Sequence, residues 1–222
     1  MAASTKKKAI YGWALYDWAN SAFATTVMAG FFPIFFKKFW SAGVEPTEST
    51  FHLGVANSVA SLTILLLAPI IGAMADHGNN RRRFLAAFAS LGILTTALLF
   101  IVVEGQWMYA SLLYVLAIIG FSGGNVFYDA LLIAVSKEDQ HHRISALGFA
   151  LGYLGGGILF AINVAMTLKP EVFGLADAGE AVRWSFITVS LWWAIFSIPL
   201  FLWVPEPHSD EPAGDGSIVT SG

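Results

Sequence analysis

Residues 11–36 read YGWALYDWANSAFATTVMAGFFPIFF, a mainly apolar stretch that carries an aspartate, Asp17, and an asparagine, Asn20. About 20 apolar residues in a helix are enough to cross the hydrocarbon core of a bilayer. We therefore predict that this stretch is a membrane-spanning helix. An ionisable side chain inside such a helix is costly and usually has a function. Asp17 and Asn20 are for this reason candidate functional residues.

The composition is that of a membrane protein rather than of a soluble domain. Of the 222 residues, 56% are hydrophobic and 12% are charged, whereas soluble domains carry about 25% charged residues. The net charge of −3 is small and argues against a nucleic-acid partner. The chain has no cysteine, which excludes disulfides, thiolate metal sites and a cysteine nucleophile. We expect no enzymatic activity, no cofactor and no metal site.

Five further stretches have the length and hydrophobicity of a span, and the connections between them hold charged or turn residues. We predict an all-α polytopic membrane protein whose six transmembrane helices occupy residues 11–36, 51–75, 83–103, 107–135, 144–168 and 182–204. The six-helix domain thus covers residues 11–204. Residues 1–10 precede it, and the polar tail 205–222 is predicted to be disordered.

The distribution of Lys and Arg predicts the orientation of the chain, because cytoplasmic loops carry an excess of these residues. One side of the predicted bundle holds Lys6, Lys7, Lys8, Arg81, Arg82, Arg83, Lys137 and Arg143. The other side holds Lys37, Lys38, Lys169 and Arg183. We therefore expect the first side, with both termini, to be cytoplasmic.

The second loop, residues 72–84, reads GAMADHGNNRRRF and combines two glycines, an acid and three arginines. Glycine allows a close helix approach or a tight turn. An acid paired with an arginine at a helix end can hold one conformation and open in another. The spacing resembles the signature that the major facilitator superfamily carries between its second and third helices, although His77 stands where that family usually has a basic residue. We predict a conformational latch formed by Gly72, Asp76, Gly78, Arg81, Arg82, Arg83 and Arg143. The alternative is a loop that only follows the charge rule.

Three further segments sharpen this resemblance. Residues 11–26, YGWALYDWANSAFATT, are similar to the opening of the vacuolar amino-acid effluxer (autophagy-related) branch of that superfamily. Residues 123–132, GGNVFYDALL, and 143–157, RISALGFALGYLGGG, are similar to its fourth and fifth helices. The resemblance implies the N-terminal six-helix half of a twelve-helix transporter. It also implies a small solute, such as an amino acid, that binds between two rocking halves, with proton coupling as a further expectation.

Two acids inside the spans, Asp17 and Asp129, form the candidate substrate or proton site. Each lies six residues from the cytoplasmic end of its span, about 9 Å inside. Asn20 shares a helix face with Asp17, and Asn125 shares one with Asp129. In the resembled fold the first and fourth helices line the central cavity. No Lys or Arg lies inside the spans to pair with these acids, and a carboxyl removed from water favours its protonated form. The alternative is that each acid caps a broken helix or bonds a neighbouring hydroxyl.

Glycines recur at every fourth position of the fifth span, at Gly148, Gly152 and Gly156. Small residues at this spacing form a groove in which another helix packs. A phosphate-binding loop fits poorly, because no strand precedes the glycines and no lysine follows them. We predict a helix-packing role for them.

The expected partners are the lipid bilayer, a small-molecule solute and a second six-helix half from the same gene, a split gene or a second copy. A homodimeric six-span carrier and a non-transporting six-span protein or truncated remnant stay open as alternatives. The resemblance points to an integral protein of a bacterial cytoplasmic membrane. His141 and His142 lie in a charged loop, where we expect a solvated turn rather than a metal site.

Overall fold

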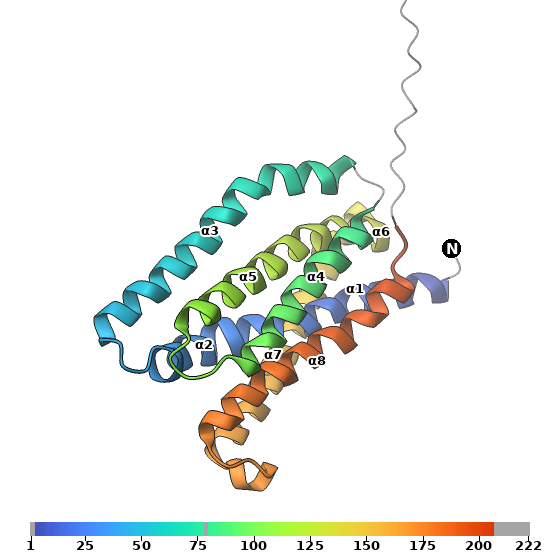
Figure 1. Ribbon diagram of the computed structural model, residues 1–222. Coiled ribbons are helices and arrows are strands. Elements are labelled where there is room, and N and C mark those ends of the chain that lie inside the picture. The colour runs from blue at the N-terminus through green and yellow to red at the C-terminus, as the bar shows by residue number, and fades with distance from the viewer. Residues whose placement is uncertain (1–2, 78–79, 207–222) are drawn as a thin grey trace, which may run out of the picture.

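The computed structural model describes residues 3–77 and 80–206 and is built from helices that run back and forth along one bundle (Figure 1). Within the described residues, six helical segments are long and apolar enough to cross a membrane. They are Thr5–Trp40, Pro46–Ala75, Arg81–Ile101, Trp107–Val135, Glu138–Leu168 and Ala178–Trp203. The predicted all-α fold with six spans is confirmed, and the chain is an integral membrane protein.

The helices differ in length and type along these six segments. In chain order they are α1 (Ala3–Ala22), η1 (Phe23–Phe31), α2 (Phe32–Phe35), η2 (Phe36–Trp40), α3 (Pro46–His77), α4 (Arg81–Leu98), η3 (Leu99–Ile101), α5 (Trp107–Ala130), α6 (Leu132–Val135), η4 (Glu138–Gln140), α7 (His141–Leu168), η5 (Pro170–Phe173) and α8 (Ala178–Trp203). The short elements η3, η4 and η5 are 3₁₀ turns at the ends of spans.

The first span changes from α-helix to π-helix beyond Asp17, Asn20 and Ser21. In η1 the chain forms wide turns, and the N–H of Phe32 donates to the carbonyl of Val27, five residues earlier. Pro33 follows directly and has no N–H to continue the α-helical pattern. π-Helical turns are rare and often mark functional sites.

A proline also accounts for the shape of α3. This helix contains Pro69 and changes direction along its last part (Figure 1). Proline removes a helical hydrogen bond and is a common cause of kinks. Among the six spans α3 is the least buried, so it forms one edge of the bundle.

The helices pair in a pattern that relates the first three spans to the last three. Helix α1 packs against α7 and α8, α5 packs against α3 and α4, and α4 packs against α8. Exchanging spans one to three for spans four to six converts the two pairs of α1 into the two pairs of α5 and leaves the α4–α8 pair unchanged. This is the arrangement of two inverted three-helix repeats, although the two parts share little sequence. The contact between α7 and α8 has no counterpart of similar extent between α3 and α4 within the described residues.

The two ends of the bundle can be distinguished by the residues that they hold. Lys6 Nζ donates to Gln140 Oε1 (3.3 Å) at the end where α1 begins and α8 ends, which we call the basic end. At the opposite end Trp40 Nε1 donates to the carbonyl of Val102 (3.1 Å). Nearby, the side chain of Arg183 donates from Nε to Phe100 O (3.0 Å) and lies over the Phe100 ring.

Candidate solute and proton site

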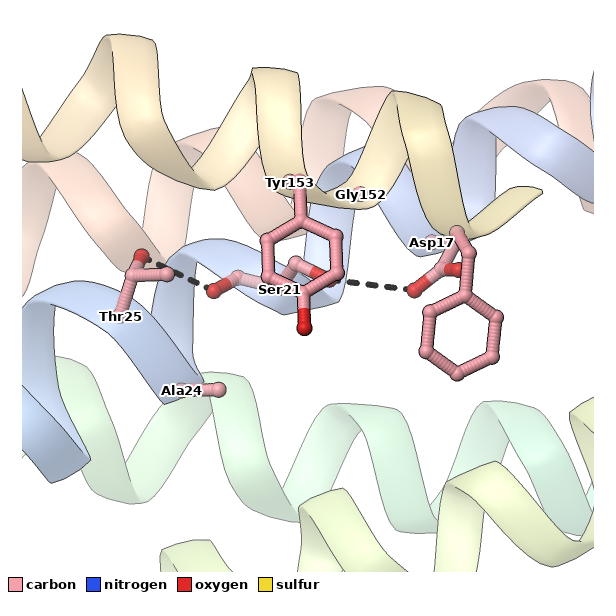
Figure 2. Close-up of a pocket in the computed structure, with 7 residues that line it drawn as sticks. Asp17, Ser21, Ala24, Thr25, Gly152 and Tyr153 are labelled. Carbon is pink, nitrogen blue, oxygen red and sulfur yellow. Dashed lines mark hydrogen bonds between the residues drawn. The ribbon is translucent and has the colours of Figure 1, made fainter. Parts of the chain in front are cut away.

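Three polar side chains lie on one face of the first span, at intervals of four residues. Ser21 Oγ donates a hydrogen bond to Asp17 Oδ1 (3.1 Å), and Thr25 Oγ1 donates to the carbonyl of Ser21 (3.0 Å). Thr25 Oγ1 also lies 3.2 Å from the carbonyl of Gly156 on α7. Figure 2 shows this row, with Ser21 between Thr25 and Asp17. The row places a carboxylate and two hydroxyls where α1 and η1 contact α7.

A pocket of about 190 Å³ opens beside this row, between α1 and α7 (Figure 2). Asp17 is half-buried in its wall. The complete lining consists of Asp17, Ser21, Ala24, Thr25, Phe149, Gly152 and Tyr153. An acid, two hydroxyls and two aromatic rings can together hold a small cationic or proton-donating group, because aromatic faces attract cations.

The glycines of α7 allow α1 to approach this closely. A methyl group at Gly148 would lie 2.8 Å from the Trp13 ring, and one at Gly152 would lie 2.7 Å from Ser21 Oγ and 2.9 Å from Asp17 Cγ. At Gly156 it would lie 2.9 Å from Thr25 Oγ1. The glycine stripe therefore forms the surface against which the polar row of α1 rests.

The two asparagines join α1 to α5 instead of holding the acids. Asn20 Nδ2 donates to Asn125 Oδ1 at 2.5 Å, and Asn20 is almost completely buried. The pair satisfies part of the hydrogen-bonding capacity that each amide would otherwise lose on burial. The structure thus gives the partner of Asp17 as the hydroxyl of Ser21, one turn along the same helix.

Asp129 lies on α5, outside the pocket wall, and its side chain is exposed. It is close enough to Asp17 for the two charges to interact. Tyr128, the preceding residue, interacts electrostatically with both acids. Asp17 thus lies in the pocket wall, and Asp129 lies outside the wall but near enough for the charges of the two acids to interact.

Sequence reasoning missed the hydroxyl and aromatic members of the site. Ser21 and Thr25 follow Asp17 at intervals of four, which puts all three on one helix face. That interval was a usable signal. The contributions of Phe149 and Tyr153 depend on how α7 is rotated against α1, which the sequence of either helix does not show.

At the basic end, the first two arginines of the predicted latch bind backbone groups of neighbouring helices. Arg81 Nε donates to the carbonyl of Ala75 at the end of α3, and Arg82 Nη2 donates to the carbonyl of Phe201 near the end of α8. The carboxylate of Glu206 accepts from the N–H groups of Arg81 (2.6 Å) and Arg82 (3.1 Å). Glu206 thus caps the start of α4, where the helix dipole favours an anion.

For the other residues of the predicted latch the structure describes fewer contacts. Asp76 belongs to the last turn of α3, but its side chain and the whole of Gly78 lie outside the described residues. Arg83 and Arg143 have exposed side chains. A methyl group at Gly72 would meet nothing within 4 Å. Among the described residues no other helix approaches Gly72 closely, since α3 lies at the edge of the bundle.

A family model and individual known proteins both indicate the same family for this chain. The family model described as "Vacuole effluxer Atg22 like" matches residues 5–52 and 47–222. An uncharacterised MFS-type transporter of Bacillus subtilis, YxiO, is 37% identical over 205 residues, which cover 88% of this chain and 48% of that protein. Autophagy-related protein 22 of Coccidioides immitis is 22% identical, with 96% of this chain and 50% of that protein aligned.

The chain spans about half the length of these curated relatives. Its fold of six helical spans, paired as inverted repeats, agrees with one half of a major facilitator. The match to the family model extends over nearly the whole chain. The chain therefore belongs to the vacuole effluxer Atg22-like family of the major facilitator superfamily.

Proposed function

We propose that this chain is the first half of a secondary transporter that moves a small solute with an amino group, such as an amino acid, by alternating access. The observation that carries the proposal is the pocket between α1 and α7, which holds a carboxylate inside a membrane span. Acidic side chains at such a place typically mark ion, proton or substrate pathways.

The two acids lie inside their spans, on the same side of the midplane. Asp17 lies about 8 Å from the middle of the span Thr5–Trp40, on the side of the basic end, by helical rise. Asp129 lies about 12 Å from the middle of the span Trp107–Val135, on the same side. Both acids are thus displaced in one direction from a midplane at which transporters of this architecture bind their solutes. We assign them, with Asn20 and Asn125 as the link between their helices, to the solute or proton site.

The second half of the transporter is the proposed partner. The chain spans half the length of its relatives, and apolar side chains of α3 and α7 such as Leu65, Leu66 and Phe149 are exposed. A second six-helix half, encoded in the same gene, in a split gene or as a second copy of this chain, would complete the cavity. We also propose that the basic end and both termini face the cytoplasm of a bacterial cell, following the Lys and Arg distribution.

The test is solute uptake by proteoliposomes that contain this chain together with its natural second half. Asp17→Asn and Asp129→Asn keep the side-chain size and remove the charge, so each is expected to insert normally and to lose transport or its pH dependence. Asp139→Asn is the matched control, because Asp139 is exposed in the short turn η4. Wild-type uptake across the pH range by both Asp17→Asn and Asp129→Asn would refute the site assignment.

A further inference from the structure

The hydroxyl of Tyr128, on α5, is buried and has no hydrogen-bond partner among the described residues. The side chain of Tyr128 is 5% exposed. Native proteins contain few unpaired buried groups, and each one requires an explanation such as a bound water or a functional task. The Tyr128 hydroxyl interacts electrostatically with both acids of the proposed site.

The ring of Tyr128 is held firmly by α1, which leaves its hydroxyl as the unused part of the side chain. It stacks on the Trp13 ring with 4.4 Å between centroids and an interplanar angle of 12°, and it packs against Tyr16 at 5.1 Å. Trp13 Nε1 also donates to the carbonyl of Tyr128 (3.0 Å). Packing alone would therefore be served equally well by a phenylalanine.

The glycine stripe of α7 provides a measure of where this hydroxyl lies. A methyl group at Gly148 would be 3.0 Å from Tyr128 Oη, and one at Gly152 would be 2.9 Å from Asp17 Oδ1. Side chains four residues apart on a helix have their Cβ atoms about 5–6 Å apart. The hydroxyl and the carboxyl thus rest against two glycines that lie one turn apart on the same helix. Asp129 follows Tyr128 directly in the chain.

We propose that the Tyr128 hydroxyl relays a proton between Asp17 and Asp129 through bridging water, which rests on the function proposed above. In the relay, protonated Asp17 releases its proton toward the Tyr128 oxygen while the hydroxyl proton of Tyr128 passes to the Asp129 carboxylate. One O–H bond forms on Tyr128 as another breaks. The tyrosine stays neutral, and the net change is one proton moved from Asp17 to Asp129. The reverse sequence moves it back.

The surroundings of the hydroxyl fit this role. The ionisable groups that interact with Tyr128 are Asp17 and Tyr16 from α1 and Asp129 from its own helix. On α7 the residue against it is Gly148, which brings no charge. We assign the bridge to water, because a buried water requires two to four polar partners. The unpaired Tyr128 hydroxyl and the two carboxyl groups can be these partners. One proton can then pass between Asp17 and Asp129 in either direction.

The deciding variant is Tyr128→Phe, which removes only the hydroxyl and keeps the stacked ring. Tyr114→Phe is the matched control, because Tyr114 is also buried, stacks on Phe32 at 3.7 Å, and lies about 21 Å along α5 from Tyr128. In proteoliposomes with the natural second half, Tyr128→Phe should lose pH-gradient-driven accumulation by tenfold or more, with an unchanged unfolding temperature. Tyr114→Phe should accumulate solute like the wild type.

Asp17→Asn and Asp129→Asn are the reference variants, because each removes one of the two groups between which the proton is relayed. Wild-type accumulation by Tyr128→Phe, while Asp17→Asn and Asp129→Asn fail, would refute the relay and leave the proposed function intact. Normal accumulation by both asparagine variants would refute the proposed function and the relay together.

Discussion

Replacing Gly152 with alanine introduces one methyl group at the contact between the glycine stripe and the polar row. The added carbon would lie 2.7 Å from Ser21 Oγ and 2.9 Å from Asp17 Cγ, both inside normal van der Waals separation. Both neighbours belong to α1, and they form the Ser21–Asp17 hydrogen bond of the pocket. Either α1 must move away from α7 or the two side chains must leave their positions.

The size of the effect follows from comparison with a glycine of the same helix that has free space. A methyl group at Gly157 would meet nothing within 4 Å, so Gly157→Ala gains only helix propensity, about 0.8–1.0 kcal/mol. Gly152→Ala gains the same amount and pays an overpacking cost of about 1–3 kcal/mol. Because the propensity term cancels between the two variants, we expect Gly152→Ala to be about 1–3 kcal/mol less stable than Gly157→Ala.

The assay is equilibrium unfolding of the purified chain in mixed micelles, followed by helix content, together with uptake in the reconstituted transporter. Gly152→Ala should also weaken solute uptake, since the displaced carboxyl no longer occupies its place in the pocket wall. Equal stability of the two alanine variants, with wild-type uptake in both, would show that α1 and α7 are not in close contact at this position.

Three further predictions concern the orientation, the basic end and the helix pairing. A reporter fused after Gly105 should behave as external and one after Asp215 as cytoplasmic, and an external signal from the second fusion would contradict the proposed orientation. Glu206→Ala should cost about 1 kcal/mol of stability in micelle unfolding, because two N–H groups at the start of α4 lose their acceptor. A double-mutant cycle between Asn20→Ala and Asn125→Ala should give a coupling of about 0.6–1.7 kcal/mol, as for hydrogen bonds between membrane helices. A cycle with zero coupling would mean that this bond does not link α1 to α5.

The number and type of the helices were predictable because a bilayer imposes a length on every apolar stretch that crosses it. The spans begin and end within several residues of the expected places, with the largest difference at the first, where the helix already starts at Ala3. The candidate acids were predictable for a related reason, since a carboxyl in an apolar stretch stands out by its cost.

The partners of the acids were not predictable in the same way. Asn20 was placed on the face of Asp17 by helical spacing, yet it bonds to Asn125 on another helix. That choice depends on the rotation of α5 against α1, which results from the packing of many side chains at once. The capping role of Glu206 was not predictable for a different reason. It depends on the contact between the end of α8 and the start of α4.

The π-helical turns between Phe23 and Phe31 have a consequence for how this family can change in length. A wide turn holds more residues than an α-helical turn, so the loss of one residue there can be absorbed by narrowing the turn. The same deletion between Asp17 and Ser21 would rotate the carboxyl away from the Ser21 hydroxyl, since each residue of an α-helix turns the chain by about 100°. Deletions within the first span should therefore be tolerated between residues 26 and 31, beyond Thr25, and rejected between residues 17 and 21. An alignment of many family members would show this as gaps confined to the outer part of the span.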